Sequence, residues 1–189
     1  MRVIAGSHRG RRLSGPRGLS LRPTSDKVRE ALFSILGDRI SGCRFLDLYA
    51  GTGAVGIEAL SRGAQLVTFV ESEPCAVQIM RKNLTGCRLL DRADLRVGPT
   101  QSFLRQRQFW HGPYDVVFAD PPYADQDAVE LVLDGWHLGL VTPEGVMVIE
   151  QPARVEPSPA TDSVQLIRRY AYGDTALWLY GSTPRRSPA

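Results

Sequence analysis

The stretch Asp47-Leu48-Tyr49-Ala50-Gly51-Thr52-Gly53-Ala54-Val55-Gly56 joins a predicted strand, Arg44–Tyr49, to a predicted helix, Gly53–Arg62. Its glycines have the spacing of a dinucleotide-binding turn, Gly51-x-Gly53-x-x-Gly56, and the next predicted strand, Leu66–Glu71, ends on an acid. Glycines in such a turn let a ligand approach the backbone, and an acid after the second strand can accept the hydroxyls of a ribose. The stretch therefore predicts a strand–helix–strand unit that binds a nucleoside-containing ligand.

On both sides of this unit the chain alternates between helical and strand patterns. The further predicted elements are a helix at Asp26–Leu36 capped by Thr24 or Ser25, a helix from Pro74 to about Leu84, a strand at Asp94–Val97, a short helix at Thr100–Gln106, a strand at Tyr114–Ala119, a helix within Asp125–Leu138 and a strand at Val146–Glu150. Short, continuously apolar strands that alternate with helices predict an α/β fold with a parallel, doubly wound sheet. The last two segments, Val164–Tyr172 and Thr175–Tyr180, flank Gly173-Asp174 and predict an antiparallel hairpin that closes the sheet.

The first 25 residues differ in charge from the rest of the chain. They hold six arginines and no acid, whereas the remainder has 17 basic and 20 acidic residues. The six are Arg2, Arg9, Arg11, Arg12, Arg17 and Arg22. A basic arm on a mildly acidic body indicates contact with a polyanion such as nucleic acid, and the alternative is a solvated tail. Arg2–Gly6 and Leu19–Arg22 could form the strands of a basic N-terminal β-hairpin.

Length and composition are those of an ordinary globular protein. The chain has 189 residues, 43% of them hydrophobic and 23% charged, which predicts one domain with a real core. We expect a basic arm at 1–23, a main domain at 24–182 and a flexible tail at 183–189. Three cysteines without CxxC spacing, no apolar run of membrane-spanning length and no secretory h-region predict a cytoplasmic protein with reduced thiols and no bound metal.

Asp120-Pro121-Pro122-Tyr123, directly after the predicted strand Tyr114–Ala119, predicts the acceptor site. Asp120 and the Pro121 carbonyl can accept the hydrogens of an exocyclic amino group, and two prolines fix the backbone that presents them. Tyr123 can stack on a flat substrate. Asp120, Pro121 and Tyr123 are therefore the candidate catalytic residues, and the alternative is a proline-rich turn with a solvated aspartate.

Asp47 helps to choose the ligand. An acid at the end of the first strand would repel a pyrophosphate, but it suits the ammonium and sulfonium of S-adenosylmethionine. The alternative role for Asp47 is that of a partner for the following helix or loop.

Together these motifs resemble a known family. Asp47–Gly53, Glu71 and Asp120–Tyr123 are spaced like motifs I, II and IV of class I S-adenosylmethionine-dependent methyltransferases that act on amino nitrogens. Three stretches, Arg2–Leu13, Arg22–Phe33 and Phe45–Ala64, are similar to the RsmD family of bacterial 16S rRNA guanine-N2 methyltransferases. The resemblance covers roughly residues 1–180.

The resemblance implies a Rossmann-like class I methyltransferase fold with a mostly parallel seven-stranded sheet and helices on both faces. It implies methylation of the guanine-966 type, in 16S rRNA within the small subunit or its assembly intermediate, by a monomeric enzyme. The implied S-adenosylmethionine-binding residues are Asp47, Ala50, Gly51, Thr52, Gly53, Glu71, Ser72 and Asp120. The implied RNA-binding residues are the six arginines of the arm with Pro122 and Tyr123.

The sequence allows more than one group to hold the adenine and more than one function. Pro99 stands where such enzymes often place an acid or amide that holds the adenine, so a backbone amide near Thr100, Gln101 or packing would replace it. The Asp120 motif also fits DNA adenine-N6 and protein glutamine-N5 methyltransferases. An NAD-dependent oxidoreductase, or a nucleotide-binding module without catalysis, fits the glycine-rich turn but leaves Asp120–Tyr123 and the arm unexplained.

Overall fold

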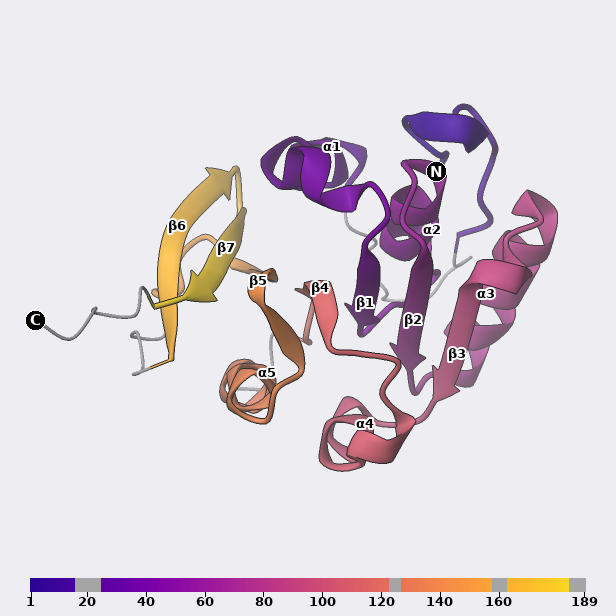
Figure 1. Cartoon of the computed structure of the whole chain (residues 1–189). Coiled ribbons are helices and arrows are strands. Elements are labelled where there is room, and N and C mark those ends of the chain that lie inside the picture. Colours follow the sequence, from indigo (N-terminus) through magenta and orange to yellow (C-terminus); the bar gives the residue numbers. More distant parts are fainter. Residues whose placement is uncertain (16–24, 123–126, 158–162, 184–189) are drawn as a thin grey trace, which may run out of the picture.

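A computed structural model of the chain describes residues 1–15, 25–122, 127–157 and 163–183. It contains one seven-stranded sheet with helices on both sides (Figure 1). The strands are β1 (Arg44–Leu48), β2 (Leu66–Glu71), β3 (Ala93–Val97), β4 (Tyr114–Ala119), β5 (Val141–Pro152), β6 (Val164–Tyr172) and β7 (Thr175–Ser182). The α-helices are α1 (Asp26–Leu36), α2 (Ala54–Ser61), α3 (Pro74–Cys87), α4 (Thr100–Arg105) and α5 (Ala128–His137). Short 3-10 helices are η1 (Gly6–His8), η2 (Gly37–Ile40), η3 (Leu90–Arg92) and η4 (Arg107–Phe109).

The strands lie in the order β3-β2-β1-β4-β5-β7-β6. The strands β1 to β5 pair in parallel, while β7 pairs antiparallel with both β5 and β6. This topology confirms the predicted class I methyltransferase fold, with its mostly parallel sheet and its C-terminal antiparallel hairpin. The chain reverses direction across the sheet between β3 and β4, which places a cleft at the carboxyl ends of β1 and β4.

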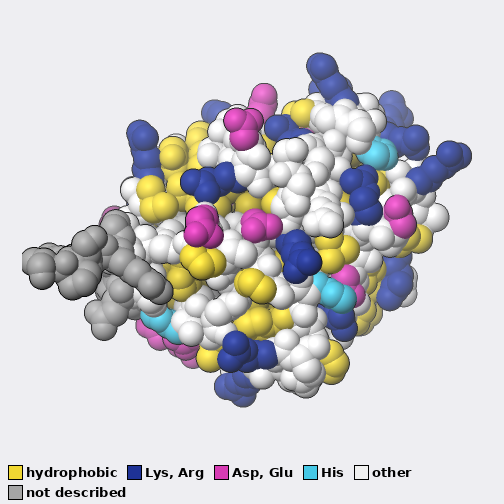
Figure 2. All heavy atoms as spheres, in the orientation of Figure 1, with side chains coloured by type: hydrophobic (Ala, Val, Ile, Leu, Met, Phe, Trp, Pro, Cys, Tyr) yellow, Lys and Arg dark blue, Asp and Glu magenta, His cyan; other side chains and the backbone are white. Residues whose placement is uncertain are grey.

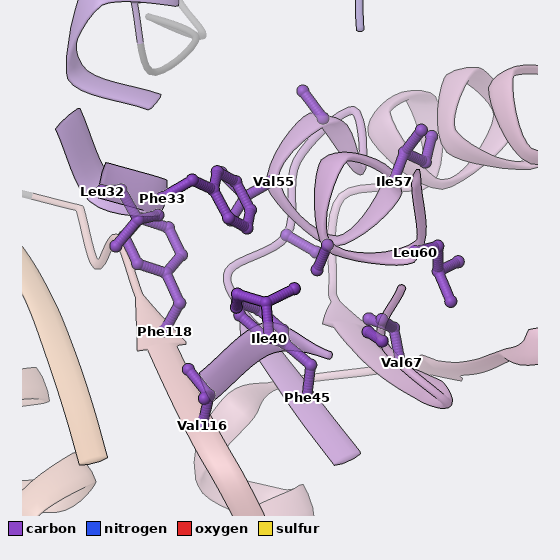
Figure 3. Packing of buried hydrophobic residues seen from close by; sticks show 14 of the residues in the cluster. Leu32, Phe33, Ile40, Phe45, Val55, Ile57, Leu60, Val67, Val116 and Phe118 are labelled. Atoms are coloured by element: carbon purple, nitrogen blue, oxygen red, sulfur yellow. The ribbon is translucent and has the colours of Figure 1, made fainter. Parts of the chain in front are cut away.

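Two apolar layers hold the sheet between its helices. One layer packs α1, α2 and α3 against one face, and Figure 3 shows part of it, with Leu32 and Phe33 of α1 against Phe118 of β4. The other layer packs α4 and α5 against the opposite face through residues such as Phe103 and Trp136. In Figure 1 these last two helices lie along the lower side of the sheet. Because both faces are covered, the central strands are apolar on both sides, as their sequences predict.

Most predicted elements are confirmed, and the differences have local causes. β1 ends at Leu48, one residue earlier than predicted, because Tyr49 adopts a left-handed conformation with φ of 59°. α3 continues to Cys87 rather than ending near Leu84, and Arg88 ends it with φ of 58°. β5 begins at Val141, earlier than the predicted Val146, and has an irregular register with β4 at that end.

The N-terminal arm forms a tighter hairpin than the sequence suggests. Arg2 bridges Arg12 in an antiparallel pair, and the chain turns at Gly6 and Gly10, which both have positive φ. The predicted partner, Leu19–Arg22, lies outside the described residues. Val3 and Leu13 are buried in the same layer as α1 and α2. The arm is therefore packed on the body along residues 1–14, because its short apolar side chains fill that layer.

Polar contacts fix the arm on α2 and α3. The buried Glu58 carboxylate accepts the backbone N–H groups of Ile4 and Ala5, at 2.7 and 2.9 Å. The Asn83 side chain accepts the N–H of Ser14 and donates to the carbonyls of Ser14 and Thr52. Asn83 thus joins the arm to the glycine-rich turn.

Candidate active site

A cleft of about 1030 Å³ opens where β1, β2, β4 and β5 end. Its walls come from the loops after these strands and from α5, together with Ser25 and Val28 at the start of α1. The volume lies at the upper end of the range for small-molecule sites, about 300–1,000 Å³. It is large enough for a nucleoside-containing ligand and part of a second substrate.

The glycine-rich turn forms one wall through its backbone. Gly51 and Gly53 have φ of 55° and 76°, so the chain between β1 and α2 turns tightly and presents Ala50, Gly51 and Thr52 to the cleft. Gly56 has a different role, since a Cβ there would lie 2.2 Å from the Phe69 ring. It allows α2 to pack closely on β2, whereas the first two glycines shape the cleft.

Asp47 lines the cleft and also holds the following helix. Its side chain is 1% exposed, and its Oδ2 accepts the N–H of Gly56 at 2.9 Å. Burial raises the pKa of Asp47 well above its usual value, and the nearby carboxylates of Asp120 and Glu71 raise it further. The Gly56 hydrogen bond opposes this shift. Both roles considered for Asp47, helix partner and cleft residue, are therefore present in the geometry.

Glu71, at the end of β2, organises the loop around it. Its Oε2 accepts the N–H of Gly51 at 2.7 Å, and its Oε1 accepts those of Ser72 and Glu73, each at 2.8 Å. A carboxylate offers about four lone-pair sites. Within the part of the chain that the structure describes, three backbone N–H groups use three of these sites. Ser72 and Glu73 line the same part of the cleft.

Asp120 begins the loop after β4, and its backbone N–H donates to the Leu48 carbonyl at 3.4 Å. Asp120, Pro121 and Pro122 line the cleft together, and Pro121 is buried. Tyr123 lies outside the described residues. The cleft therefore brings the predicted cofactor residues of β1 and β2 together with the described part of the predicted acceptor motif.

Four acids of the cleft were not predicted from the sequence. Glu73, Asp127, Glu130 and Asp134 line it beside Asp47, Glu71, Asp120 and Glu150, and no described lining residue is basic. The three acids near α5 recur on one helical side, at positions 127, 130 and 134, which is a signal that the sequence does contain. Eight carboxylates make the cleft suited to a cation and unfavourable for a phosphate. This donor set fits the ammonium and sulfonium of S-adenosylmethionine.

The far end of the cleft lies near β3. Pro99, Thr100 and Gln101, at the start of α4, all line it. The Thr100 side chain is buried and Gln101 is exposed. Thr100, through its backbone amide, and Gln101 are the predicted candidates for holding an adenine, and both line the cleft.

The described arginines of the arm lie outside the cleft. Arg2, Arg9, Arg11 and Arg12 are exposed, and Arg11 donates to the Gly86 carbonyl at 2.9 Å. Arg17 and Arg22 lie outside the described residues. In Figure 2, Lys and Arg side chains are most numerous at the upper right, where Figure 1 places the arm and α3. The same fold therefore has an acidic cleft and, outside it, a basic surface.

The three tryptophans and two of the three cysteines are buried or half-buried. Trp136 and Trp178 are buried and Trp110 is half-buried, so the three tryptophans serve packing. Cys43 and Cys87 are buried, and burial raises the pKa of the Cys43 thiol to about 12, whereas Cys75 is exposed. Across the described ranges, no cluster of His, Cys, Asp and Glu has the arrangement of a metal site. No described helix has both the length and the apolar character needed to cross a bilayer.

Comparisons with known proteins agree with this geometry. The family model described as conserved hypothetical protein 95 matches residues 1–181. The Ribosomal RNA small subunit methyltransferase D of Escherichia coli is 34% identical over 186 residues, covering 95% of this chain and 89% of that protein. The protein of the same name from Haemophilus influenzae is 33% identical, covering 95% and 93%. The solved structure of a hypothetical protein from Thermus thermophilus has a TM-score of 0.81 at 32% identity and covers 95% of this chain and 98% of that one.

Proposed function

This chain belongs to the conserved hypothetical protein 95 family, and we propose that it is an S-adenosylmethionine-dependent methyltransferase that acts on the exocyclic N2 of a guanine in 16S rRNA. The observation that carries the proposal is the acidic cleft in which Asp120-Pro121-Pro122 faces the glycine-rich turn. Membership of the family and the names of its relatives support an rRNA substrate. The finer assignment, to the guanine-966 type, rests on the resemblance of the sequence motifs to the RsmD family.

The lining of the cleft supports separate positions for the cofactor and for the methyl acceptor. Asp47, Ala50, Gly51, Thr52, Gly53, Glu71 and Ser72 would hold the cofactor over β1 and β2, with Asp120 at its reacting end. When bound, S-adenosylmethionine supplies a methyl group already activated by its sulfonium. The glycine-rich turn and Glu71 would fix the cofactor, so that the methyl group points toward the end of β4.

Asp120 and Pro121 would align the target nitrogen. The N2 lone pair of guanine is delocalised into the ring, so the amine must be oriented for attack. The Asp120 carboxylate and the Pro121 carbonyl would accept the two amino hydrogens and turn the lone pair toward the methyl group. The amine becomes acidic once it is methylated, and Asp120 can then accept its proton or pass it to water. Pro122 and Tyr123 would contact the base, with the Tyr123 ring stacked on it.

The charge distribution supports a nucleic-acid substrate. The carboxylates of the cleft repel phosphates, so a base can enter only if it is turned out of its stack while the backbone stays outside. Arginines of the arm would hold that backbone. We place the enzyme in the cytoplasm as a monomer that acts on the small subunit or its assembly intermediate.

Two experiments test this function. Calorimetry with S-adenosylhomocysteine and with NADH should give heat only with the former, and heat only with NADH would favour an oxidoreductase. Deproteinised rRNA and small subunits from a strain lacking the enzyme should then be incubated with the protein and labelled cofactor, followed by mass mapping of the product. A methyl group on guanine N2 in 16S rRNA is expected, whereas methylation only at other rRNA atoms or only of a protein glutamine in the subunit would contradict the proposal.

A further inference from the structure

Glu150 lies beside Asp120 on the acceptor side of the cleft. β4 and β5 are parallel, and Ala119 pairs with Ile149, so the next residues, Asp120 and Glu150, are neighbours at the carboxyl ends of the two strands. Glu150 is 5% exposed and lines the cleft. The proposed methyl transfer uses Asp120 but gives Glu150 no role.

The Glu150 side chain points to the side of the sheet that α1 covers. Two residues earlier on β5, Val148 belongs to the layer that packs under α1, and side chains alternate along a strand, so Glu150 returns to that side. Asp120, the first residue after β4, lines the same cleft. Thr175, on the adjacent strand β7, also lines the cleft and is 5% exposed. On β7, Leu177 pairs with Glu150 and Thr175 pairs with Pro152, so Thr175 lies diagonally across from Glu150, two residues along its strand.

We propose that Glu150 selects guanine by accepting the N1–H of the target base while Asp120 accepts hydrogens of its N2 amine. This inference rests on the proposed function and names the residue that sets its specificity. Guanine presents N1–H and the N2 amine side by side on its Watson–Crick edge, so it offers neighbouring donors to neighbouring carboxylates. The spacing of adjacent strands, about 4.8 Å, lets two flexible acidic side chains converge on one base edge.

The other substrates compatible with Asp120-Pro121-Pro122-Tyr123 present the opposite pattern. Beside its exocyclic amine, adenine has the acceptor N1 and cytosine has the acceptor N3. The side-chain amide of glutamine has its carbonyl oxygen next to the nitrogen. In each case an acceptor would face Glu150, and two facing acceptors in a buried site repel each other and leave the acceptor of the substrate without a donor.

Thr175 cannot provide this discrimination. Its hydroxyl can either donate to the O6 of guanine or accept from an amine at the same position. The choice between guanine and the other amines therefore depends on Glu150. Sites that hydrogen-bond a particular polar group reject analogues lacking it by up to about 10⁴–10⁵-fold.

The test uses 2,6-diaminopurine, which keeps the N2 amine of guanine but has an acceptor at N1. The position that the wild-type protein methylates is first mapped, and rRNA with either base at that position is reconstituted into small subunits. The kcat/KM of the full-length wild-type protein should favour guanine over 2,6-diaminopurine by at least about 100-fold. In Glu150→Gln, whose amide can donate to N1, this ratio should fall by at least about tenfold. Glu144→Gln removes an exposed carboxylate from the other end of β5 and should keep the wild-type ratio.

The outcomes separate this inference from the proposed function. If no guanine N2 is methylated in the mapping step, the function itself fails. If guanine is methylated but the wild type accepts 2,6-diaminopurine equally well, Glu150 does not read N1. If Glu150→Gln slows both substrates by the same factor, its role is structural and the inference is wrong. Binding of S-adenosylhomocysteine to the variant within a few-fold of wild type shows that the cleft is intact.

Discussion

The Asp47 carboxylate accepts the backbone N–H of Gly56, 2.9 Å away, and so ties the end of β1 to the first turn of α2. The bond lies in an almost fully buried site beside two further acids of the cleft. A buried carboxylate in such surroundings resists ionisation, so its pKa is raised.

This shift predicts how stability depends on pH. A raised pKa means that the native protein holds a proton which the unfolded chain, with a pKa of about 3.9, has already released. Ionised Asp47 therefore destabilises the native state, and stability falls as pH rises from about 3.9 toward the native pKa and levels off above it. Asp47→Asn keeps an oxygen acceptor for Gly56 and carries no charge to bury, so it should raise the free energy of unfolding at neutral pH. Denaturant unfolding of both proteins between about pH 5 and pH 8 measures this, and a less stable variant throughout would contradict it.

Substitution of Asp120 should reduce methyl transfer without weakening cofactor binding. Asp120→Ala removes an acceptor that would act on the target amine, so kcat should fall by about 100- to 1000-fold or more. Asp120→Asn keeps one oxygen acceptor, so its kcat should fall less. Affinity for S-adenosylhomocysteine should stay within a few-fold in both variants, measured by calorimetry. Asp91→Ala, in an exposed turn outside the cleft, is the control, and wild-type turnover in Asp120→Ala would refute the role.

Two glycines of the arm form a matched pair. Gly6 and Gly10 have nearly equal φ values, 79° and 83°, but a Cβ at Gly6 would lie 1.9 Å from the Ser61 carbonyl oxygen, whereas Gly10 has open space. Gly10→Ala should therefore cost only its backbone strain, about 1–2 kcal/mol. Gly6→Ala should cost more, because it also pushes the arm off α2. Thermal unfolding of the two variants tests the difference, and equal losses would mean that contact with Ser61 does not matter.

The arginines of the arm predict a salt-dependent affinity for RNA. Replacing Arg9 and Arg12 by Gln leaves the buried Val3 and Leu13 in place, so the thermal unfolding temperature should stay near that of wild type. The slope of log affinity against log salt should shrink by about 0.7–0.9 for each phosphate that the variant no longer neutralises. Asp91→Ala serves again as the control. An unchanged slope would mean that these arginines do not bind the RNA backbone.

Deletion of the arm is a less informative experiment than these substitutions. Without residues 1–14, Glu58 would lose two N–H partners and Asn83 would lose Ser14. Asn83 also holds the Thr52 carbonyl in the glycine-rich turn. A truncated protein should therefore lose stability as well as RNA affinity, and its cofactor binding could change for structural reasons.

The central sheet was predictable because its signals are local. Val116, Val117 and their neighbours form an apolar run of strand length, and Ser25 caps α1 by accepting the N–H of Val28, three residues on. The docking of the arm was not predictable, because Glu58 meets Ile4 across 54 positions in the sequence. The one available signal is an acid in the middle of the apolar helix AVGIEALS, where Glu58 is fully buried.

The candidate site was predictable to the same extent. Asp47, Glu71 and Asp120 each lie at or next to the carboxyl end of a recognisable strand, so their convergence follows from a parallel sheet. The acids of α5 reach the cleft only through tertiary packing, and the sequence assigns them no distance to Asp120. Glu150 ends the predicted strand Val146–Glu150, but its neighbour becomes known only from the register of β4 and β5.

The strand order has a consequence for how this scaffold could diverge or be redesigned. The proposed donor half lies over β3, β2 and β1, and the acceptor half over β4, β5 and β7, so the two halves share a border only between β1 and β4. Substitutions at Glu150 or Thr175 could then retune which amine is accepted while the donor half stays untouched. In this chain of 189 residues, acceptor specificity could therefore be changed almost independently of cofactor binding.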